Sequence, residues 1–359
     1  MAALQTAIET DLKANVYVQH KGDKIDKVRS YLASIFDFSH TSTQEQWLLK
    51  QMVCLPSEYY TYPTLEELIN PAASERTDLF PETLEELADK GWLLHNPDTD
   101  TYKMHRIIAE VASQKLPLTL AEVEPLIEMV TKKLSLDQNK GTPIDGFPWI
   151  SFGKAILVHF SEEVAIIITV LQNNLAIILK NLGDYEGARS LLEKAVALVE
   201  QNFKENHFLK IKYYSNLALV LQDLGKFTEA KNLLEKAVFL EEQDSKTINP
   251  FISIRYSNLA NVLKDLGQLK SAKKLLEKAV ASDLQNFGAN DPRTAISYSN
   301  LALVLQSLGK NKKAKQLLEK IVNLDEKNFG INDPRTAINY SNLALVYADL
   351  KILQQLLFY

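Results

Sequence analysis

The sequence has a single cysteine, Cys54, among its 359 residues. One cysteine can form neither a disulfide within the chain nor a cysteine-based zinc site, and such sparing use is typical of a reducing compartment. The most apolar stretch, residues 165–179, is too short for a membrane span and contains Gln172, Asn173 and Asn174. The first residues have no basic segment followed by an apolar run, so they do not form a signal peptide. We therefore expect a cytoplasmic protein with no membrane partner.

An excess of charge of one sign is also missing. The net charge is −5 at pH 7, with acidic and basic residues interspersed, and 46% of the residues are hydrophobic. This composition supports a packed core but not a surface that binds a polyanion. The six histidines are scattered, and the motifs H-E-x-x-H, G-x-S-x-G and G-x-x-x-x-G-K-[ST] do not occur. We predict that the chain is not an enzyme, holds no metal and no cofactor, and does not bind ATP.

What the sequence does contain is a repeat of 42 residues. The segment "YSNLALVLQSLGK" begins at Tyr298, and near copies begin at Tyr214, Tyr256 and Tyr340. A fixed period of this size indicates stacked units of secondary structure, each of which buries its apolar face against its neighbours. The asparagines that mark the period are Asn174, Asn216, Asn258, Asn300 and Asn342.

Each unit is predicted to contain two helices. In the fourth unit, Asp291 is placed to cap the first helix and Pro292 to occupy its first position. Gly309 is expected to end that helix in the left-handed conformation. In the fifth unit Lys351 occupies the position of this glycine. The sequence therefore predicts four full units and a truncated fifth.

These features resemble the tetratricopeptide repeat. The pattern "SNLA…GKF…A" and the loop "NDPRTA" are similar to the 42-residue subtype of kinesin light chains, and the resemblance covers residues 162–359. It implies a mainly α fold, an α-solenoid that forms a right-handed superhelix. It also implies that the concave groove of the repeats binds a protein or peptide.

The recurring asparagines are the candidate groove residues. Each lies about 100° around its helix from a core leucine, and a side-chain amide can both donate to and accept from the backbone of an extended peptide. The alternative is that each asparagine ties its helix to the backbone of the neighbouring unit. We expect a polar wall with no strong demand for an acidic ligand. The complete set is Asn174, Ser215, Asn216, Ser257, Asn258, Lys264, Ser299, Asn300, Ser341 and Asn342.

The first third of the chain is unrelated to the repeat. Residues 1–37 are predicted to be helical, and Ser42 with Glu45 forms a capping box at the start of a compact domain over residues 38–116. A helix at 81–90, strands at 92–95 and 102–104 and a further helix predict a winged-helix domain. A helical connector follows over residues 117–161, and the repeat domain takes up residues 162–359.

The segment "KGWL…YKMHRIIAEVA" resembles the winged helix of bacterial STAND-type nucleotide switches (NB-ARC, NLR-like proteins). In that family a Met-His pair begins the helix after the wing, so the resemblance implies that His105 contacts the phosphates of bound ADP. The alternative is that His105 only packs or caps there. Because the phosphate-binding loop does not occur, we infer that the chain is the C-terminal part of such a switch, or one that has lost its ATPase.

Three functions follow from this sequence. The preferred one is the ligand-binding sensor of a switch protein, whose partners are a protein or peptide and an ATPase domain that precedes the chain. The second is a free-standing scaffold of the kinesin-light-chain type. The third, a DNA-binding regulator, is disfavoured because helix 81–90 has four acidic residues and one lysine, so no nucleic acid is expected. The apolar end of the truncated unit, residues 351–359, is expected to fold back or to pair two molecules.

Overall fold

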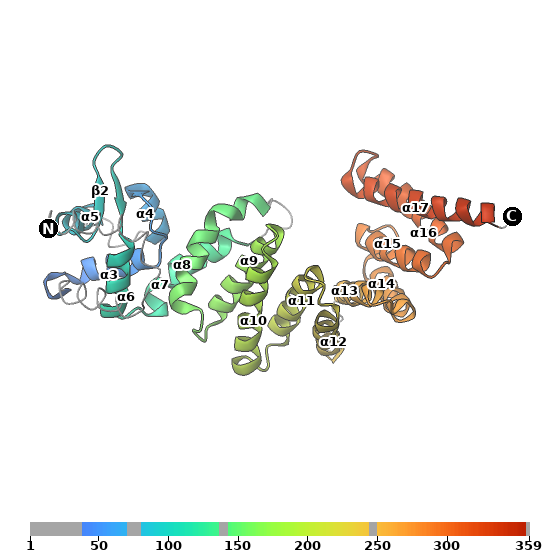
Figure 1. The fold of residues 1–359 in the computed structure, drawn as a ribbon, viewed down its shortest axis with the longest axis horizontal. Coiled ribbons are helices and arrows are strands. Elements are labelled where there is room, and N and C mark those ends of the chain that lie inside the picture. The colour runs from blue at the N-terminus through green and yellow to red at the C-terminus, as the bar shows by residue number, and fades with distance from the viewer. Residues whose placement is uncertain (1–37, 70–79, 136–142, 244–249, 357–359) are drawn as a thin grey trace, which may run out of the picture. The chain divides into compact units, whose positions relative to one another are not determined.

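The computed structural model describes residues 38–69, 80–135, 143–243 and 250–356, without the side chains of 143–144 and 352–356. The chain is mainly helical and divides into two compact units, residues 1–178 and 179–359, each of which is considered by itself (Figure 1). The helix expected over residues 1–37 lies outside the described residues. None of the described helices has the length and apolar character that a membrane span requires.

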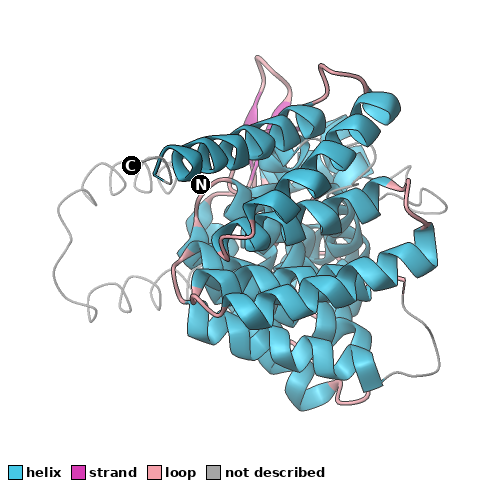
Figure 2. Ribbon diagram, turned by 90° about the vertical axis from the view of Figure 1, so that its right-hand side faces the viewer, coloured by secondary structure: helices cyan, strands magenta, loops and turns pink. Residues whose placement is uncertain are grey.

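The first unit combines helices with a small sheet, whose strands are magenta in Figure 2. The antiparallel strand order is β1–β3–β2, and Tyr102 pairs with Tyr60 on one side and His95 on the other. The order of elements from residue 80 to 115 is as predicted, with bounds that differ by one or two residues. The elements are η2 (Phe38–His40), α3 (Thr43–Val53), β1 (Tyr60–Thr61), α4 (Tyr62–Ile69), α5 (Phe80–Asp89), β2 (Leu94–Asn96), β3 (Thr101–Lys103), α6 (Arg106–Lys115), α7 (Leu120–Lys133), η4 (Pro143–Trp149) and α8 (Ile150–Phe160).

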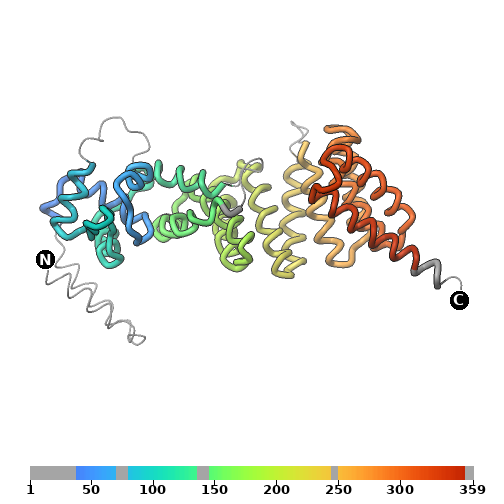
Figure 3. Tube along the Cα trace, turned by 90° about the horizontal axis from the view of Figure 1, so that it is seen from above, coloured from blue at the N-terminus to red at the C-terminus, as the bar shows by residue number. Residues whose placement is uncertain are grey.

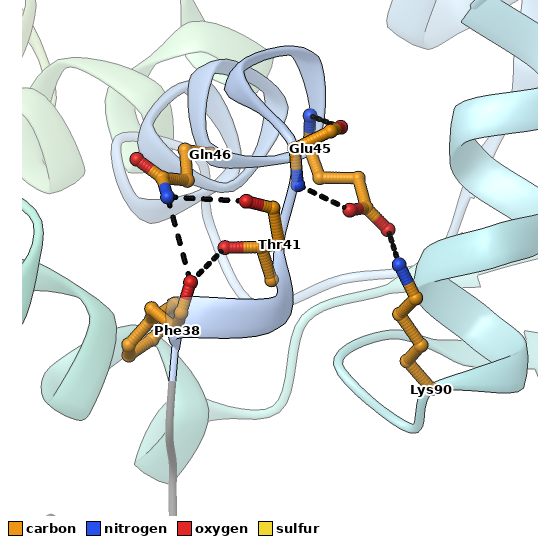
Figure 4. A network of polar contacts seen from close by, with 6 residues as sticks. Phe38, Thr41, Glu45, Gln46 and Lys90 are labelled. Atoms are coloured by element: carbon orange, nitrogen blue, oxygen red, sulfur yellow. Dashed lines mark hydrogen bonds and ion pairs between the residues drawn. The ribbon is translucent and has the colours of Figure 1, made fainter.

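A network of polar contacts fixes the start of α3 (Figure 4). The predicted capping box is confirmed, since Ser42 Oγ accepts from the Glu45 N–H at 3.1 Å and the Glu45 carboxylate accepts from the Ser42 N–H at 2.7 Å. The other carboxylate oxygen of Glu45 accepts from Lys90 Nζ at 2.5 Å. Just before the cap, Thr41 Oγ1 donates to the carbonyl of Phe38 at 2.6 Å. The cap of α3 is thereby tied to the residue that follows α5.

The core of the first unit is formed where α3 packs against α5, α6 and α7. Leu48, Leu84 and Leu87 are completely buried there. Cys54 is also completely buried, and this burial raises the pKa of its thiol to about 12. A thiol with such a pKa is not a thiolate near neutral pH, so Cys54 acts as a small core residue and not as a nucleophile.

The second unit is a succession of helix pairs (Figure 3). The second helices α12, α14 and α16 each pack on the first helix of their own pair and on the first helix of the next pair, and α10 packs on α11. The fold class predicted for the repeats, an α-solenoid of helix pairs, is confirmed. The helices are α9 (Ile166–Asn181), which crosses the division between the units, α10 (Tyr185–Asn202), α11 (His207–Asp223), α12 (Phe227–Gln243), α13 (Ile252–Asp265), α14 (Leu269–Phe287), α15 (Pro292–Ser307), α16 (Asn311–Phe329) and α17 (Pro334–Leu356).

The ends of the first helices follow the predicted chemistry. Asp291 accepts a hydrogen bond from the Arg293 N–H at 2.9 Å, and Pro292 begins α15. Gly309 has φ 71°, and the next N–H, that of Lys310, returns to the carbonyl of Leu305 at 2.8 Å. This Schellman arrangement favours glycine at the left-handed position. Where Lys351 replaces the glycine, the helix does not stop, and α17 continues to Leu356.

Candidate binding surface on the first helices

From α11 onward, the first helix of each repeat has one side that its neighbours leave half-buried or exposed. On α13 this side contains Ile254, Asn258 and Asn261, at spacings of four and three residues that place them together on the helix surface. We call the corresponding side of α11, α13, α15 and α17 the first-helix face. It has three columns with a period of 42 residues, and all their members are half-buried or exposed. The columns are Lys212, Ile254, Ile296 and Ile338; Asn216, Asn258, Asn300 and Asn342; and Leu219, Asn261, Leu303 and Leu345.

The predicted asparagine ladder does not behave as one set. Asn174, in α9, is buried, and its Nδ2 donates to the backbone carbonyl of Thr131 at 3.1 Å. That carbonyl is one of the last four of α7, which have no partner within the helix. The Asn174 Oδ1 also accepts from Asn173 Nδ2 at 3.2 Å. At this position the structure shows the alternative role, an internal brace, and Asn174 does not belong to an open surface.

The middle of the ladder is different. The side-chain amides of Asn258 and Asn300 are half-buried and have no hydrogen-bond partner among the described residues. Asn342 Nδ2 lies 3.5 Å from Ser299 Oγ, which itself donates to Asn339 Oδ1 at 2.7 Å. Two adjacent repeats therefore present amides that are available to a ligand.

Two of the four predicted groove serines are turned inward. Ser215 and Ser257 are buried, and Ser215 Oγ donates to the carbonyl of Ile211 in its own helix at 2.7 Å. The exposed Ser341 likewise donates to the carbonyl of Ala337 at 3.0 Å. Ser215 and Ser257 are therefore not on the first-helix face. The residue before each asparagine is buried here, as is the leucine that follows it.

A polar ladder connects the ends of successive first helices. Lys180 Nζ lies 3.2 Å from Asp223 Oδ2, and the same two positions recur one and three repeats later. Gln222 Nε2 donates to Asp265 Oδ2 at 2.6 Å, and Gln306 Nε2 donates to Asp349 Oδ2 at 2.7 Å. Each of these pairs ties one repeat to the next.

The third rung of this ladder is broken. Ser307 occupies the position at which the other rungs have an aspartate, and its hydroxyl donates to the carbonyl of Leu303 in its own helix at 3.1 Å. The ammonium of Lys264 therefore has no partner within the described ranges. Lys264, a predicted groove residue, is half-buried, at the end of the face on α13.

The isoleucine column was missed by the sequence analysis, which expected a polar wall. Ile254 is 46% exposed, Ile296 58% and Ile338 61%. The available signal was an apolar residue four positions before the asparagine in three consecutive repeats. Residues four apart share a helix side, so the recurrence could have placed the column beside the asparagines. Lys212 takes the same position in the preceding repeat.

His105 lies in the first unit, two residues after the end of β3. It is the N-cap of α6, and its Nδ1 accepts from the Ile107 N–H at 3.2 Å. Burial, together with the charge of Lys103, lowers the pKa of the imidazole, so it is neutral near pH 7. The structure thus shows the capping role, and contact with a nucleotide stays a prediction.

No catalytic or metal-binding constellation joins these residues. Within the described ranges, histidine, cysteine, aspartate and glutamate form no cluster that could hold a metal ion. The chemistry of the first-helix face is that of amides, apolar side chains and two ammonium groups. Such a surface can bind and align another chain.

Comparison with known families identifies the repeats. The tetratricopeptide repeat family model matches residues 168–238, 252–327 and 299–351. These residues are tetratricopeptide repeats. Arrays of this kind are scaffolds for protein interaction, and their stacked units create extended binding surfaces. A comparison with curated proteins gives no significant match.

Several solved structures are similar to the chain. The TPR-like repeats of a Podosopora anserina protein, ascribed to a kinesin light chain, are 21% identical, with 58% of this chain and 96% of that chain covered and a TM-score of 0.49. BtubC from P. vanneervenii is 20% identical over 65% of this chain and 85% of its own, with a TM-score of 0.48. A STAND protein with a tetratricopeptide repeat sensor from Pyrococcus horikoshii is 16% identical over 90% of this chain and 50% of its own, with a TM-score of 0.43.

Proposed function

We propose that the tetratricopeptide repeats bind an extended segment of another protein across the first-helix face. The observation that carries this proposal is the contrast within the asparagine ladder. Asn174 is buried and hydrogen-bonded, whereas the amides of Asn258 and Asn300 are half-buried and have no partner among the described residues. Each of these amides can pair with one backbone N–H and one backbone carbonyl of a ligand.

The role of the first unit in this proposal is to couple binding to a nucleotide switch. Support comes from the resemblance of "KGWL…YKMHRIIAEVA" to the winged helix of STAND proteins and from the element order of helix, two paired strands and helix. By this resemblance, His105, the N-cap of α6, would be the histidine that contacts the nucleotide. An ATPase domain that precedes the chain would then be the partner of the first unit.

The second candidate is a free-standing scaffold. It is favoured by one observation, namely that the sequence contains no G-x-x-x-x-G-K-[ST] motif to hold a nucleotide. Binding of ADP to the chain fused to a STAND ATPase domain, compared with the same fusion carrying His105→Ala, would separate the two. Loss of ADP affinity in the variant supports the sensor, and equal affinity in both supports the scaffold.

A DNA-binding role is not proposed. On α5 the side chains of Glu82, Glu85, Glu86 and Asp89 are all exposed. A helix with this charge repels the phosphate backbone, on which affinity for DNA largely depends.

The proposed function is tested by panning a random library of displayed dodecapeptides against the whole chain. Selected peptides are then titrated against the wild type and against the double variant Asn258→Ala, Asn300→Ala. We expect at least a tenfold loss of affinity, roughly the effect of two hydrogen bonds, with an unchanged melting temperature. Peptides that bind both forms equally, or a library that yields no binder, would contradict the proposal.

A further inference from the structure

The isoleucine column is an ordered feature of the first-helix face. Ile254, Ile296 and Ile338 lie on α13, α15 and α17, and each of these first helices contacts the next one. Three exposed isoleucines thus recur at one repeat position on helices that contact one another, so they are aligned rather than scattered. Scattered exposed apolar residues are normal, whereas an aligned apolar surface marks an interaction site.

The column begins with a cation. Lys212 stands at the isoleucine position of the preceding repeat, on α11, which contacts α13. Its side chain is half-buried, and its ammonium has no acceptor among the described residues. Burial lowers the pKa of this group, since the charged form has lost part of its hydration. A carboxylate of a bound ligand would replace the hydration that the Lys212 ammonium has lost on burial.

A second unpaired cation lies on α13, ten residues beyond Ile254, which is about 15 Å along the helix. Lys264, on α13, has no partner among the described residues, because Ser307 stands where the other rungs have an aspartate. The nearest aspartate in sequence, Asp265, already accepts from Gln222, and Asp223 is paired with Lys180. Both unpaired ammonium groups therefore belong to α11 and α13, and the exposed apolar residues continue from there onto α15 and α17.

The spacing of the helices selects the ligand's conformation. Packed helices lie about 8–10 Å apart. A polyproline II segment rises about 3.1 Å per residue with three residues per turn, so side chains three apart lie on one side at about 9 Å. In a β-strand, side chains three apart point to opposite faces. The column therefore suits a polyproline II segment better than a strand.

We propose that the first-helix face recognises a polyproline II segment that places an acidic side chain on Lys212 and apolar side chains on Ile254, Ile296 and Ile338, at intervals of three residues. This proposal rests on the proposed function and specifies the ligand of the same surface. The amides of Asn258 and Asn300 lie one helical turn away and bind the segment's backbone.

The test uses synthetic decapeptides and the whole chain. One peptide has glutamate at position 1 and leucine at positions 4, 7 and 10, with proline and serine between them, and a second has the reverse order. A control peptide of the same composition places the leucines two residues apart. Fluorescence anisotropy is expected to show that at least one of the two decapeptides with leucines three residues apart binds about tenfold more tightly than the control.

Variants assign the contacts. Ile296→Gln is expected to weaken the binding about tenfold, whereas Ile331→Gln, at a residue 64% exposed in the loop before α17, is expected to leave it unchanged. Lys212→Gln is expected to lower the affinity for the peptide with glutamate about fivefold. It is expected to leave unchanged the affinity for the same peptide with glutamine in place of glutamate. Melting temperatures confirm that each variant is folded.

The outcomes separate this inference from the proposed function. If panned peptides bind through Asn258 and Asn300 but the decapeptides with leucines three residues apart bind no better than the control, the inference is wrong and the proposed function stands. The inference is also wrong if Lys212→Gln lowers the affinity for the glutamate peptide and for the glutamine peptide by the same factor. If no panned or designed peptide binds the face, both are wrong.

Discussion

At the scale of single residues, equivalent positions of the repeat have different roles. The five asparagines occupy the same place in the sequence pattern, yet Asn174 braces the end of α7 and Asn258 faces outward without a partner. The pattern could not show this difference, because it depends on what packs against each helix and not on the helix itself.

This difference predicts opposite responses to one substitution. Asn174→Ala should lower the free energy of unfolding by about 1–3 kcal/mol, because the buried carbonyl of Thr131 loses its donor. Asn258→Ala should leave it unchanged or raise it by about 0.5 kcal/mol, since alanine is the better helix former. Urea denaturation of the two variants measures both, and equal losses would show that the whole ladder is a brace.

A second prediction concerns pH and the buried carboxylate of Glu45. Burial alone would raise its pKa, but hydrogen bonds from Lys90 and Ser42 and the charge of Lys90 outweigh it, so the pKa is lowered. A lowered pKa in the folded state stabilises the fold above the unfolded-state pKa of about 4.3. This contribution is lost as the pH falls through the folded-state pKa.

Glu45→Gln should therefore cost about 1–3 kcal/mol at pH 7, and the deficit should shrink as the pH falls below about 4. The matched control is Glu86→Gln, at an exposed position of α5. Chemical denaturation from pH 7 to pH 3 follows the difference. A deficit that stays constant across this range would show that the ionised form of Glu45 is not what stabilises the cap.

At the scale of helices, a tyrosine joins a second helix to the next first helix at three of the four junctions from α10 to α17. Tyr256 Oη donates to Glu242 Oε1 at 2.8 Å, and Lys278 Nζ lies 5.2 Å from the centre of its ring. Tyr214 and Glu200 repeat this contact, and so do Tyr340 and Glu326. In the fourth repeat the glutamate position is Leu284, so Tyr298 keeps only the lysine over its ring among the described contacts.

The repeat thus contains its own control. Tyr256→Phe should destabilise the chain by about 0.5–1.5 kcal/mol, because one hydrogen bond is lost. Tyr298→Phe should have no measurable effect, because its hydroxyl has no such partner. Thermal and urea unfolding compare the two, and an equal cost would mean that the hydroxyl bond is not what joins the helices.

Element boundaries were predictable to the extent that they depend on local chemistry. The capping box of Ser42 and Glu45, the start of α15 at Asp291 and Pro292, and the glycine ends act within one turn of helix, so the sequence contains everything that determines them. Two of the four predicted groove serines do not lie on the first-helix face, for the opposite reason. Ser215 and Ser257 are buried, and the sequence of a single helix gives no information about which neighbours cover it.

At the scale of the whole molecule, the period predicted the fold because each unit repeats the same packing. Departures from the period, in contrast, locate the candidate site. Lys212 replaces an isoleucine and Ser307 an aspartate, and each departure leaves a cation without a partner in the described structure. A strict repeat stabilises the solenoid, and changes within it distinguish one part of the surface from another.

The central claim is that a partner chain lies across the first-helix face. A photoreactive benzoylphenylalanine in place of Leu303 on that face tests it most directly, with a panned peptide as ligand and the same probe in place of Phe239, exposed on α12, as control. The account predicts peptide cross-links at position 303 and none at position 239. Cross-links at position 239 alone, or equal yields at both, would contradict it.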